Sequence, residues 1–80
     1  MYYDIVLKAQ YERSETMAIH LKAARVNANL TQAEAAESLG ISKNTLANYE
    51  MYRTIPDIEL SKRIANLYGL TVDDIIFYAR

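Results

Sequence analysis

The sequence predicts an all-α domain of five short helices that follows an N-terminal extension. The chain has 80 residues, 51% of them hydrophobic types, which suits a single compact domain. Its helix breakers are few, namely Gly40, Gly69 and Pro56, whereas a sheet protein of this size needs more turn residues. Between these breakers, apolar residues recur at helical spacing after residues that commonly begin helices. Because the chain has no cysteine, apolar packing alone must hold the domain together.

The N-terminal extension is predicted to cover residues 1–16, and the helical domain residues 17–80. From Tyr3 to Tyr11, apolar and polar residues alternate with nearly strict period two, which is typical of a β-strand. A lone strand has no ladder partner within a helical chain. The segment is therefore expected either to pair with a second copy of itself or to form a mobile arm.

The first two helices are predicted from an apolar stripe and from a capping motif. The stripe of the first helix lies at Met17, Leu21, Ala24 and Ala28. Asn29 follows, and asparagine tolerates the left-handed conformation in which helices often end. Thr31 and Glu34 have the spacing of a capping box, which opens a second helix that ends at Gly40.

The last three helices are predicted from their first residues. Ser42 is a natural N-cap for a third helix that runs to about Met51. Pro56-Asp57 opens a fourth helix, which closes at Gly69. Thr71 to Asp74 is expected to begin a fifth helix, with its acidic residues in the first turn, where the helix dipole favours them.

The segment from Gln32 to Glu50 carries the functional argument. Its two helices are joined by the four residues Leu39-Gly40-Ile41-Ser42, a connection too tight for parallel helices. Ala36 provides a small side chain where the helices approach, and Gly40 supplies a turn conformation that a Cβ atom would penalise. The sequence therefore predicts a helix-turn-helix in this segment.

Further stretches match a known pattern in order and at the right spacing. They are Leu30-Thr31-Gln32, Ala36, Leu39-Gly40-Ile41-Ser42, Leu46, Tyr49-Glu50, Pro56-Asp57-Ile58-Glu59, Ile64-Ala65 and Thr71-Val72-Asp73. From about Leu21 to Phe77 the chain thus resembles the Cro/CI-type, lambda-repressor-like DNA-binding family. The resemblance implies a five-helix fold whose third helix enters the DNA major groove. It also implies a bacterial, phage or mobile-element source and a cytoplasmic protein that associates with the nucleoid through DNA.

Candidate DNA contacts are carried over from the family by position. Lys43, Asn44 and Asn48 fall where family members read base edges, and lysine can donate to guanine while asparagine can bond adenine bidentately. The alternative is a merely solvated helix face. Positions that contact phosphate fall on Gln32, Ser42, Thr45, Arg53 and Thr54. Ser42 and Thr45 are more often a cap and a first-turn hydroxyl, and an exposed Arg53 without a role is the alternative for that residue.

The resemblance also implies a structural ion pair. In the family, an arginine of the first helix pairs with a glutamate that ends the third, and Arg25 and Glu50 occupy these positions. The pair is expected to fix the recognition helix. Two residues depart from the family pattern. Tyr52 replaces a usual glycine, which leaves the following backbone course open, and its side chain is expected to lie along the DNA phosphates instead. Ser61 replaces a usual leucine, so a slight rotation of the fourth helix is expected.

No arrangement of residues indicates catalysis. His20 is the only histidine and is expected on a helix surface, and Asp73-Asp74 is explained by helix capping. Without a cysteine, a Ser/His/Asp set or a glycine-rich phosphate loop, we expect no enzyme, no metal, no cofactor and no small-molecule ligand. The longest apolar run, Ile75 to Ala79, is far shorter than the roughly 20 residues of a membrane span, so no membrane partner is expected.

The sequence therefore predicts a regulator that binds double-stranded DNA, a repressor that occupies a pseudo-palindromic operator as a homodimer. The net charge of −1 does not indicate this partner, so the prediction depends on the placement of residues. The alternative is an antitoxin or adaptor whose helical face binds a protein. Two apolar features are expected to form the dimer: Ile75 to Tyr78 on the last helix, and a second stripe of the first helix at Ile19, Ala23 and Val26. Either the extension covers this stripe and pairs with its twin, or the last helix alone makes the contact.

Overall fold

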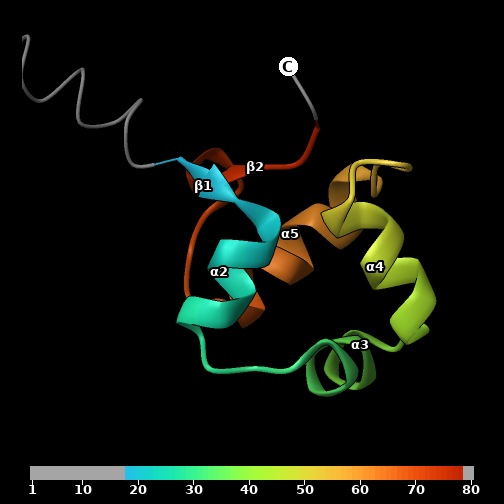
Figure 1. The fold of residues 1–80 in the computed structure, drawn as a ribbon. Coiled ribbons are helices and arrows are strands. Elements are labelled where there is room, and N and C mark those ends of the chain that lie inside the picture. The colour runs from blue at the N-terminus through green and yellow to red at the C-terminus, as the bar shows by residue number, and fades with distance from the viewer. Residues whose placement is uncertain (1–17, 79–80) are drawn as a thin grey trace, which may run out of the picture.

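The computed structural model describes residues 18–78. In chain order, its elements are β1 (Ile19–His20), α2 (Leu21–Asn27), α3 (Gln32–Leu39), α4 (Lys43–Glu50), α5 (Ile58–Leu67), the 3-10 turn η1 (Val72–Asp74) and β2 (Ile75–Ile76). Figure 1 shows β1 and β2 side by side at one edge of the domain, away from α3. The predicted strand between Tyr3 and Tyr11 and the predicted stripe residue Met17 lie outside the described residues.

Three helices begin at the caps that the sequence predicts. The Thr31 hydroxyl accepts a hydrogen bond of 3.1 Å from the Glu34 amide, and a Glu34 carboxylate oxygen accepts one of 2.9 Å from the Thr31 amide. The hydrogen bond that the Thr31 amide donates to the carboxylate lowers the pKa of Glu34, because it favours the charged form. Ser42 caps α4 and Asp57 caps α5 in the same way, each side chain accepting from a backbone amide three residues later. The predicted starts of these helices are confirmed.

All four α-helices of the described residues end in the same backbone motif. The first residue after α3, and the second after each of the other three helices, adopts a positive φ, and the amide of the next residue bonds back to a carbonyl five residues earlier, as in the Schellman motif. These residues are Asn29, Gly40, Tyr52 and Gly69, with φ of 61°, 70°, 59° and 74°. Glycine and asparagine adopt this conformation at little cost, whereas tyrosine does not. The end of α4 is therefore the unusual one.

The expectation of a purely helical fold is wrong at one edge of the domain. Ile19 pairs with Ile75 and His20 with Ile76 in a two-stranded parallel sheet. The first helix consequently begins at Leu21, and the residues before it are extended. Isoleucine favours extended backbone because its β-branched side chain is restricted in a helix. The pairing joins residues that are remote in the sequence, so no local pattern indicates it.

The predicted fifth α-helix is also wrong. Its capping motif is present, since the Thr71 amide donates a hydrogen bond of 3.0 Å to the Asp74 carboxylate. Only one 3-10 turn follows before the chain enters β2. Ile75 and Phe77 are each 6% exposed while Ile76 between them is half-buried, which is the alternation of a strand. The described residues thus contain four α-helices, not five.

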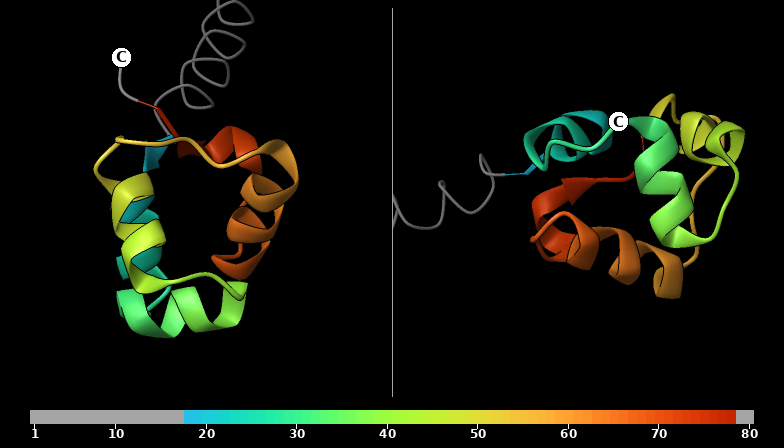
Figure 2. Two further views of the ribbon diagram at one scale, coloured as in Figure 1. Left: turned by 90° about the vertical axis from the view of Figure 1, so that its right-hand side faces the viewer. Right: turned by 90° about the horizontal axis from the view of Figure 1, so that it is seen from below.

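The core lies between the four helices and the small sheet. Its buried apolar residues are Leu21, Ala24, Ala35, Ala36, Leu39, Leu46, Ile64, Ala65, Tyr68, Ile75 and Phe77. Figure 2 shows α3 across one end of the domain and the segment between α4 and α5 across the opposite end. Ser61, where the family has leucine, is buried, and its hydroxyl lies 3.4 Å from the Pro56 carbonyl oxygen, which accepts its hydrogen. None of the helices in residues 18–78 has the length and apolar character needed to span a membrane.

Candidate nucleic-acid interface

Helix α4 places polar side chains toward solvent and an apolar one into the core. Lys43 and Asn44 are exposed, Asn48 is half-buried, and Leu46 is fully buried. In Figure 1, α4 lies at the outer side of the domain. The three residues expected to read bases therefore lie on one helix, with Lys43 and Asn44 exposed as an element that enters a groove requires, and with Asn48 partly exposed.

A buried ion pair fixes the end of α4. Nε of Arg25 lies 2.6 Å from Oε2 of Glu50, and Nη2 of Arg25 lies 3.2 Å from Oε1 of the same carboxylate. The side chains of Arg25 and Glu50 are 9% and 2% exposed. The hydrogen bond to Glu50 raises the pKa of Arg25, so the guanidinium stays charged. Arg25 belongs to α2 and Glu50 to α4, so the pair holds the two helices together.

Two further bonds extend this pair into a network. Nη1 of Arg25 donates a hydrogen bond of 2.8 Å to the Leu30 carbonyl oxygen. Nε2 of Gln32 donates one of 2.9 Å to Oε1 of Glu50, which ties the first residue of α3 to the last residue of α4. Glu50 thus accepts hydrogen bonds from side chains of two helices, Arg25 of α2 and Gln32 of α3. This second partner of Glu50 was not predicted from the sequence, which assigned Gln32 only a phosphate contact.

Tyr68 lies beside the ion pair as a buried group. The charges of Glu50 and Arg25 both act on the phenol, and burial raises the pKa of Tyr68 to about 12. Within residues 18–78, its hydroxyl has no hydrogen-bond partner. The aromatic ring belongs to the core. Tyr68 therefore contributes packing next to the network that fixes α4.

The remaining predicted phosphate contacts lie at the two ends of α4. At its start, the Ser42 hydroxyl donates to Thr45 Oγ1 over 2.8 Å and accepts from the Thr45 amide over 3.0 Å. Both hydroxyls are thus engaged in capping, which agrees with the more common role of such residues. Beyond its end, Arg53 and Thr54 are exposed, and the Arg53 amide donates 2.9 Å to the Asn48 carbonyl oxygen.

Tyr52 makes a connection that the sequence did not predict. Its hydroxyl is hydrogen-bonded to Nδ1 of His20 and donates to the Ile76 carbonyl oxygen over 3.4 Å. His20, expected on a helix, instead lies in β1 and is exposed. The positive φ of Tyr52 accounts for the glycine that the family usually has there. The side chain runs from the end of α4 to the sheet.

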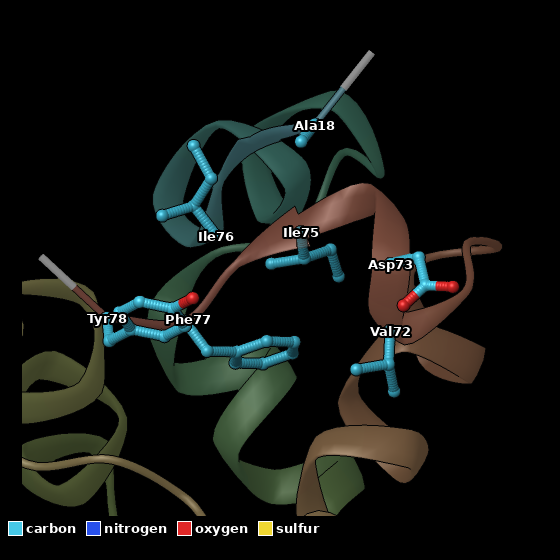
Figure 3. Close-up of a pocket in the computed structure, with 7 residues that line it drawn as sticks. All are labelled: Ala18, Val72, Asp73, Ile75, Ile76, Phe77 and Tyr78. Atoms are coloured by element: carbon cyan, nitrogen blue, oxygen red, sulfur yellow. The ribbon is translucent and has the colours of Figure 1, made fainter. Parts of the chain in front are cut away.

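A pocket of about 280 Å³ lies next to this sheet (Figure 3). Its lining residues are Ala18, Val72, Asp73, Ile75, Ile76, Phe77 and Tyr78. In Figure 3, Asp73 and Tyr78 stand at opposite sides, with Ile75 and Phe77 between them. The lining contains one carboxylate and no basic group. In the part of the chain that the structure describes, no group of three metal-binding side chains gathers either there or elsewhere.

Comparison with known proteins places this architecture in a family. The sequence profile of a family described as helix-turn-helix matches residues 21–75. The chain is 43% identical over 56 residues to the HTH-type transcriptional regulator ImmR of Bacillus subtilis, which covers 70% of this chain and 44% of ImmR. It is 36% identical over 58 residues to the uncharacterized HTH-type transcriptional regulator MJ0272 of Methanocaldococcus jannaschii, covering 72% of this chain and 88% of MJ0272.

A third relative is the cryptic phage CTXphi transcriptional repressor RstR of Vibrio cholerae. The two are 33% identical over 52 residues, which covers 65% of this chain and 47% of RstR. The matched region thus spans less than half the length of ImmR and of RstR. No solved structure matches the chain. The profile covers more than half of the chain, and the matched residues include all four helices, so the chain belongs to the Cro/CI-type, lambda-repressor-like helix-turn-helix family of DNA-binding transcription regulators.

Proposed function

We propose that the protein represses transcription by binding a specific double-stranded DNA operator and excluding polymerase from it. The observation that supports this proposal is that α4 exposes polar side chains while its end is held in place. Its outward face bears Lys43 and Asn44 in solvent and Asn48 half-buried, while Glu50 at its end is fixed by a buried ion pair. A rigid helix with accessible lysine and asparagine side chains suits readout of guanine and adenine in the major groove. Such a regulator acts at the nucleoid, in the cytoplasm.

Phosphate contacts are proposed at both ends of this helix. At the start of α3, one amide hydrogen of Gln32 bonds Glu50, and the second amide hydrogen makes no bond within residues 18–78, so it can donate to a phosphate. Beyond α4, the exposed guanidinium of Arg53 and hydroxyl of Thr54 suit the same purpose. Thr45 keeps its own hydroxyl hydrogen for a phosphate, whereas Ser42 would donate to one by turning its hydroxyl away from Thr45; these two hydroxyls complete the proposed set. These contacts would position α4 without reading sequence.

The repressor assignment draws on one relative. RstR is by its name a transcriptional repressor of a phage, and its matched region covers all or nearly all of the helix-turn-helix of this chain. Occupying an operator needs no cofactor and no second domain, because a bound protein blocks polymerase by its presence. Repression of this kind therefore requires only that the domain bind its operator tightly and specifically.

We also propose that the protein binds DNA as a homodimer. One recognition helix covers only a few base pairs, and two-fold proteins of this type read two half-sites about one helical turn apart. The predicted dimer surface needs revision, because Ile75 and Phe77 are buried in the core of their own domain. Of the predicted apolar residues, Ala23 is exposed, and Val26 and Tyr78 are 52% and 55% exposed. These three residues, with residues 1–16, are the proposed contributors.

Binding to duplex DNA at increasing salt concentration tests the proposal. Sites would first be selected from random duplexes, and the selected site and an unrelated duplex would then be compared. We expect the selected site to bind more tightly, and the logarithm of the binding constant to fall linearly with the logarithm of salt concentration, because phosphate contacts release counterions. Binding that is absent, or unchanged by salt, would favour an antitoxin or adaptor that binds a protein instead.

Sedimentation separates the homodimer from the monomer. The full chain is expected to be a dimer, and Tyr78→Asp to be monomeric if the exposed ring lies in the interface. Lys62→Asp, an exposed change on α5, is the matched control. A full chain that stays monomeric at high concentration and binds a palindrome with one copy per site would contradict the dimer.

A further inference from the structure

Tyr52 holds a backbone conformation that is unfavourable for its residue type, at the point where α4 ends. Its φ of 59° lies in the left-handed region, where the other three helix ends have Asn29, Gly40 and Gly69. A side chain with a Cβ atom is strained there, and such strain persists only where the surrounding structure fixes the residue. The contacts of the Tyr52 side chain show what fixes it.

These contacts join Tyr52 to both strands of the small sheet. The hydroxyl is hydrogen-bonded to Nδ1 of His20 and donates to the Ile76 carbonyl oxygen over 3.4 Å. His20 and Ile76 are partners across the sheet, so a single hydroxyl bridges a cross-strand pair. The two rings lie 5.7 Å apart between centroids, with an interplanar angle of 55°.

The residues that follow Tyr52 are those expected to touch the DNA backbone. Arg53 and Thr54 are exposed, and the Arg53 amide is held by the Asn48 carbonyl oxygen at 2.9 Å. The backbone therefore leaves α4 in a direction set on one side by Asn48 and on the other by the sheet. A loop that is already ordered loses less conformational entropy when its side chains bind.

We propose that Tyr52 is a positioning residue that holds Arg53 and Thr54 in place for contact with DNA phosphates. The bonds of Tyr52 to His20 and Ile76, here termed the Tyr52 latch, act through the loop and do not touch DNA. This inference rests on the proposed function, because it concerns the same interface. It explains why tyrosine occupies a backbone conformation that suits glycine better. A glycine at this position would have no side chain to bond to the sheet, so it could not hold the loop.

The first test compares Tyr52→Phe with the unaltered chain on the selected site and on a random duplex of equal length. The variant keeps the ring and loses both hydrogen bonds. We expect affinity for both duplexes to fall about five-fold, because one ordered hydrogen-bonded link is lost and phosphate contacts are independent of sequence. The slope of binding against salt should fall by up to about one counterion. Asn66→Ala, which removes an exposed polar side chain on α5 outside the proposed DNA and dimer surfaces, is the control and should bind unchanged.

Two further variants separate positioning from stability. Tyr52→Gly removes the latch but also relieves the backbone strain, so its thermal midpoint should stay close to that of the unaltered chain while its affinity falls as in Tyr52→Phe. In a background that carries Arg53→Ala and Thr54→Ala, Tyr52→Phe should cause no additional loss of affinity, because the residues through which it acts are gone.

The outcomes distinguish the latch from the proposed function. If the unaltered chain binds duplex DNA with a steep salt dependence, and both Tyr52 variants bind as it does, the latch is overturned and DNA binding stands. A loss of affinity that persists in the double-alanine background also overturns the latch, since Tyr52 then acts by another route. An unaltered chain that binds no duplex DNA overturns both proposals.

Discussion

Arg25 and Glu50 form a bidentate ion pair, 2.6 Å at its shorter contact, that is almost entirely removed from solvent. Both charges have given up most of their hydration, so each depends on the other. The carboxylate also accepts from Gln32, and the guanidinium donates to the Leu30 carbonyl oxygen. The position of α4 therefore depends on the bonds of its buried residue Glu50 to Arg25 of α2 and Gln32 of α3. The exposed side chains of α4 take no part in these bonds.

Removing one partner of this pair should be costly. We expect Arg25→Ala to lower the free energy of unfolding by about 3–5 kcal/mol, because Glu50 is left as a buried charge. In a Glu50→Gln background the same change should cost clearly less, since no charge is then stranded. Urea denaturation of the unaltered chain, the two single variants and the double variant measures the cost of Arg25→Ala in both backgrounds. Lys22→Ala, an exposed change on the same helix, is the control; equal effects of Lys22→Ala and Arg25→Ala would contradict the structural role of the pair.

The asparagines of α4 should affect sequence preference and not general affinity. We expect Asn44→Ala or Asn48→Ala to weaken binding to the selected site by about 1–3 kcal/mol and to leave binding to random DNA nearly unchanged, because base contacts exist only at the right sequence. Titration of both duplexes measures this. Asn66→Ala, on the exposed face of α5, is the matched control. Equal losses on both duplexes would move these asparagines to the class of phosphate contacts.

Tyr68 should make the domain less stable at alkaline pH. Its pKa is raised to about 12 by burial, whereas an unfolded tyrosine titrates near pH 10. Between these values the unfolded chain releases the proton and the folded chain keeps it, so stability is lost as pH rises through this window and is fully present below it. Over the window, we expect the chain to lose about 2 kcal/mol more than Tyr68→Phe does.

Denaturation at about pH 8 and about pH 11 measures the part of this difference that has developed by the middle of the window, about 1.4 kcal/mol. At the lower pH, Tyr68→Phe should be as stable as the unaltered chain or slightly more so, because it removes a hydroxyl that is buried without a partner among residues 18–78. Tyr78→Phe, a change at an exposed tyrosine, should follow the unaltered chain throughout. Parallel pH profiles for the chain and Tyr68→Phe would contradict the prediction.

Gly40 should be required for its backbone conformation and not for space. Its φ is 70°, and a Cβ atom added there would meet no atom within 4 Å. We therefore expect Gly40→Ala to destabilise the domain by about 1 kcal/mol through left-handed strain alone, and Gly40→Asn to cost less because asparagine tolerates this region. Thermal denaturation of both variants decides the point. A larger loss for Gly40→Asn than for Gly40→Ala would indicate a steric cause.

The parts of the fold that were predicted correctly depend on local chemistry. Thr31 with Glu34, Ser42 and Asp57 begin helices because a side chain caps nearby amides, and Gly40 ends one because it tolerates a positive φ. Each signal lies within a few residues of its effect. The pairing of Arg25 with Glu50 is not local, and it was expected only because the chain resembles a family that has such a pair.

The parts that were missed depend on contacts between remote segments. Ile19 and Ile75 are in strands because their segments pair with each other through backbone hydrogen bonds. The residues next to either of them in the sequence do not indicate this pairing. The capping motif at Thr71 begins a single 3-10 turn, but no α-helix follows because the chain then enters β2. Tyr52 was recognised as a departure and expected along the DNA phosphates, because its bonds to the sheet can be foreseen only once the sheet is known.

The parallel pairing of β1 with β2 also has a kinetic consequence. These strands are the first and last elements of the described domain, so their contact closes nearly all of it into one loop. Closing a long loop costs chain entropy before any contact repays it, whereas α3 and α4 meet across a short turn. We therefore expect the two middle helices to associate early in folding and the sheet late. During synthesis, the domain cannot close until Ile76 has left the ribosome, so α4 forms before Tyr52 can bond to the sheet.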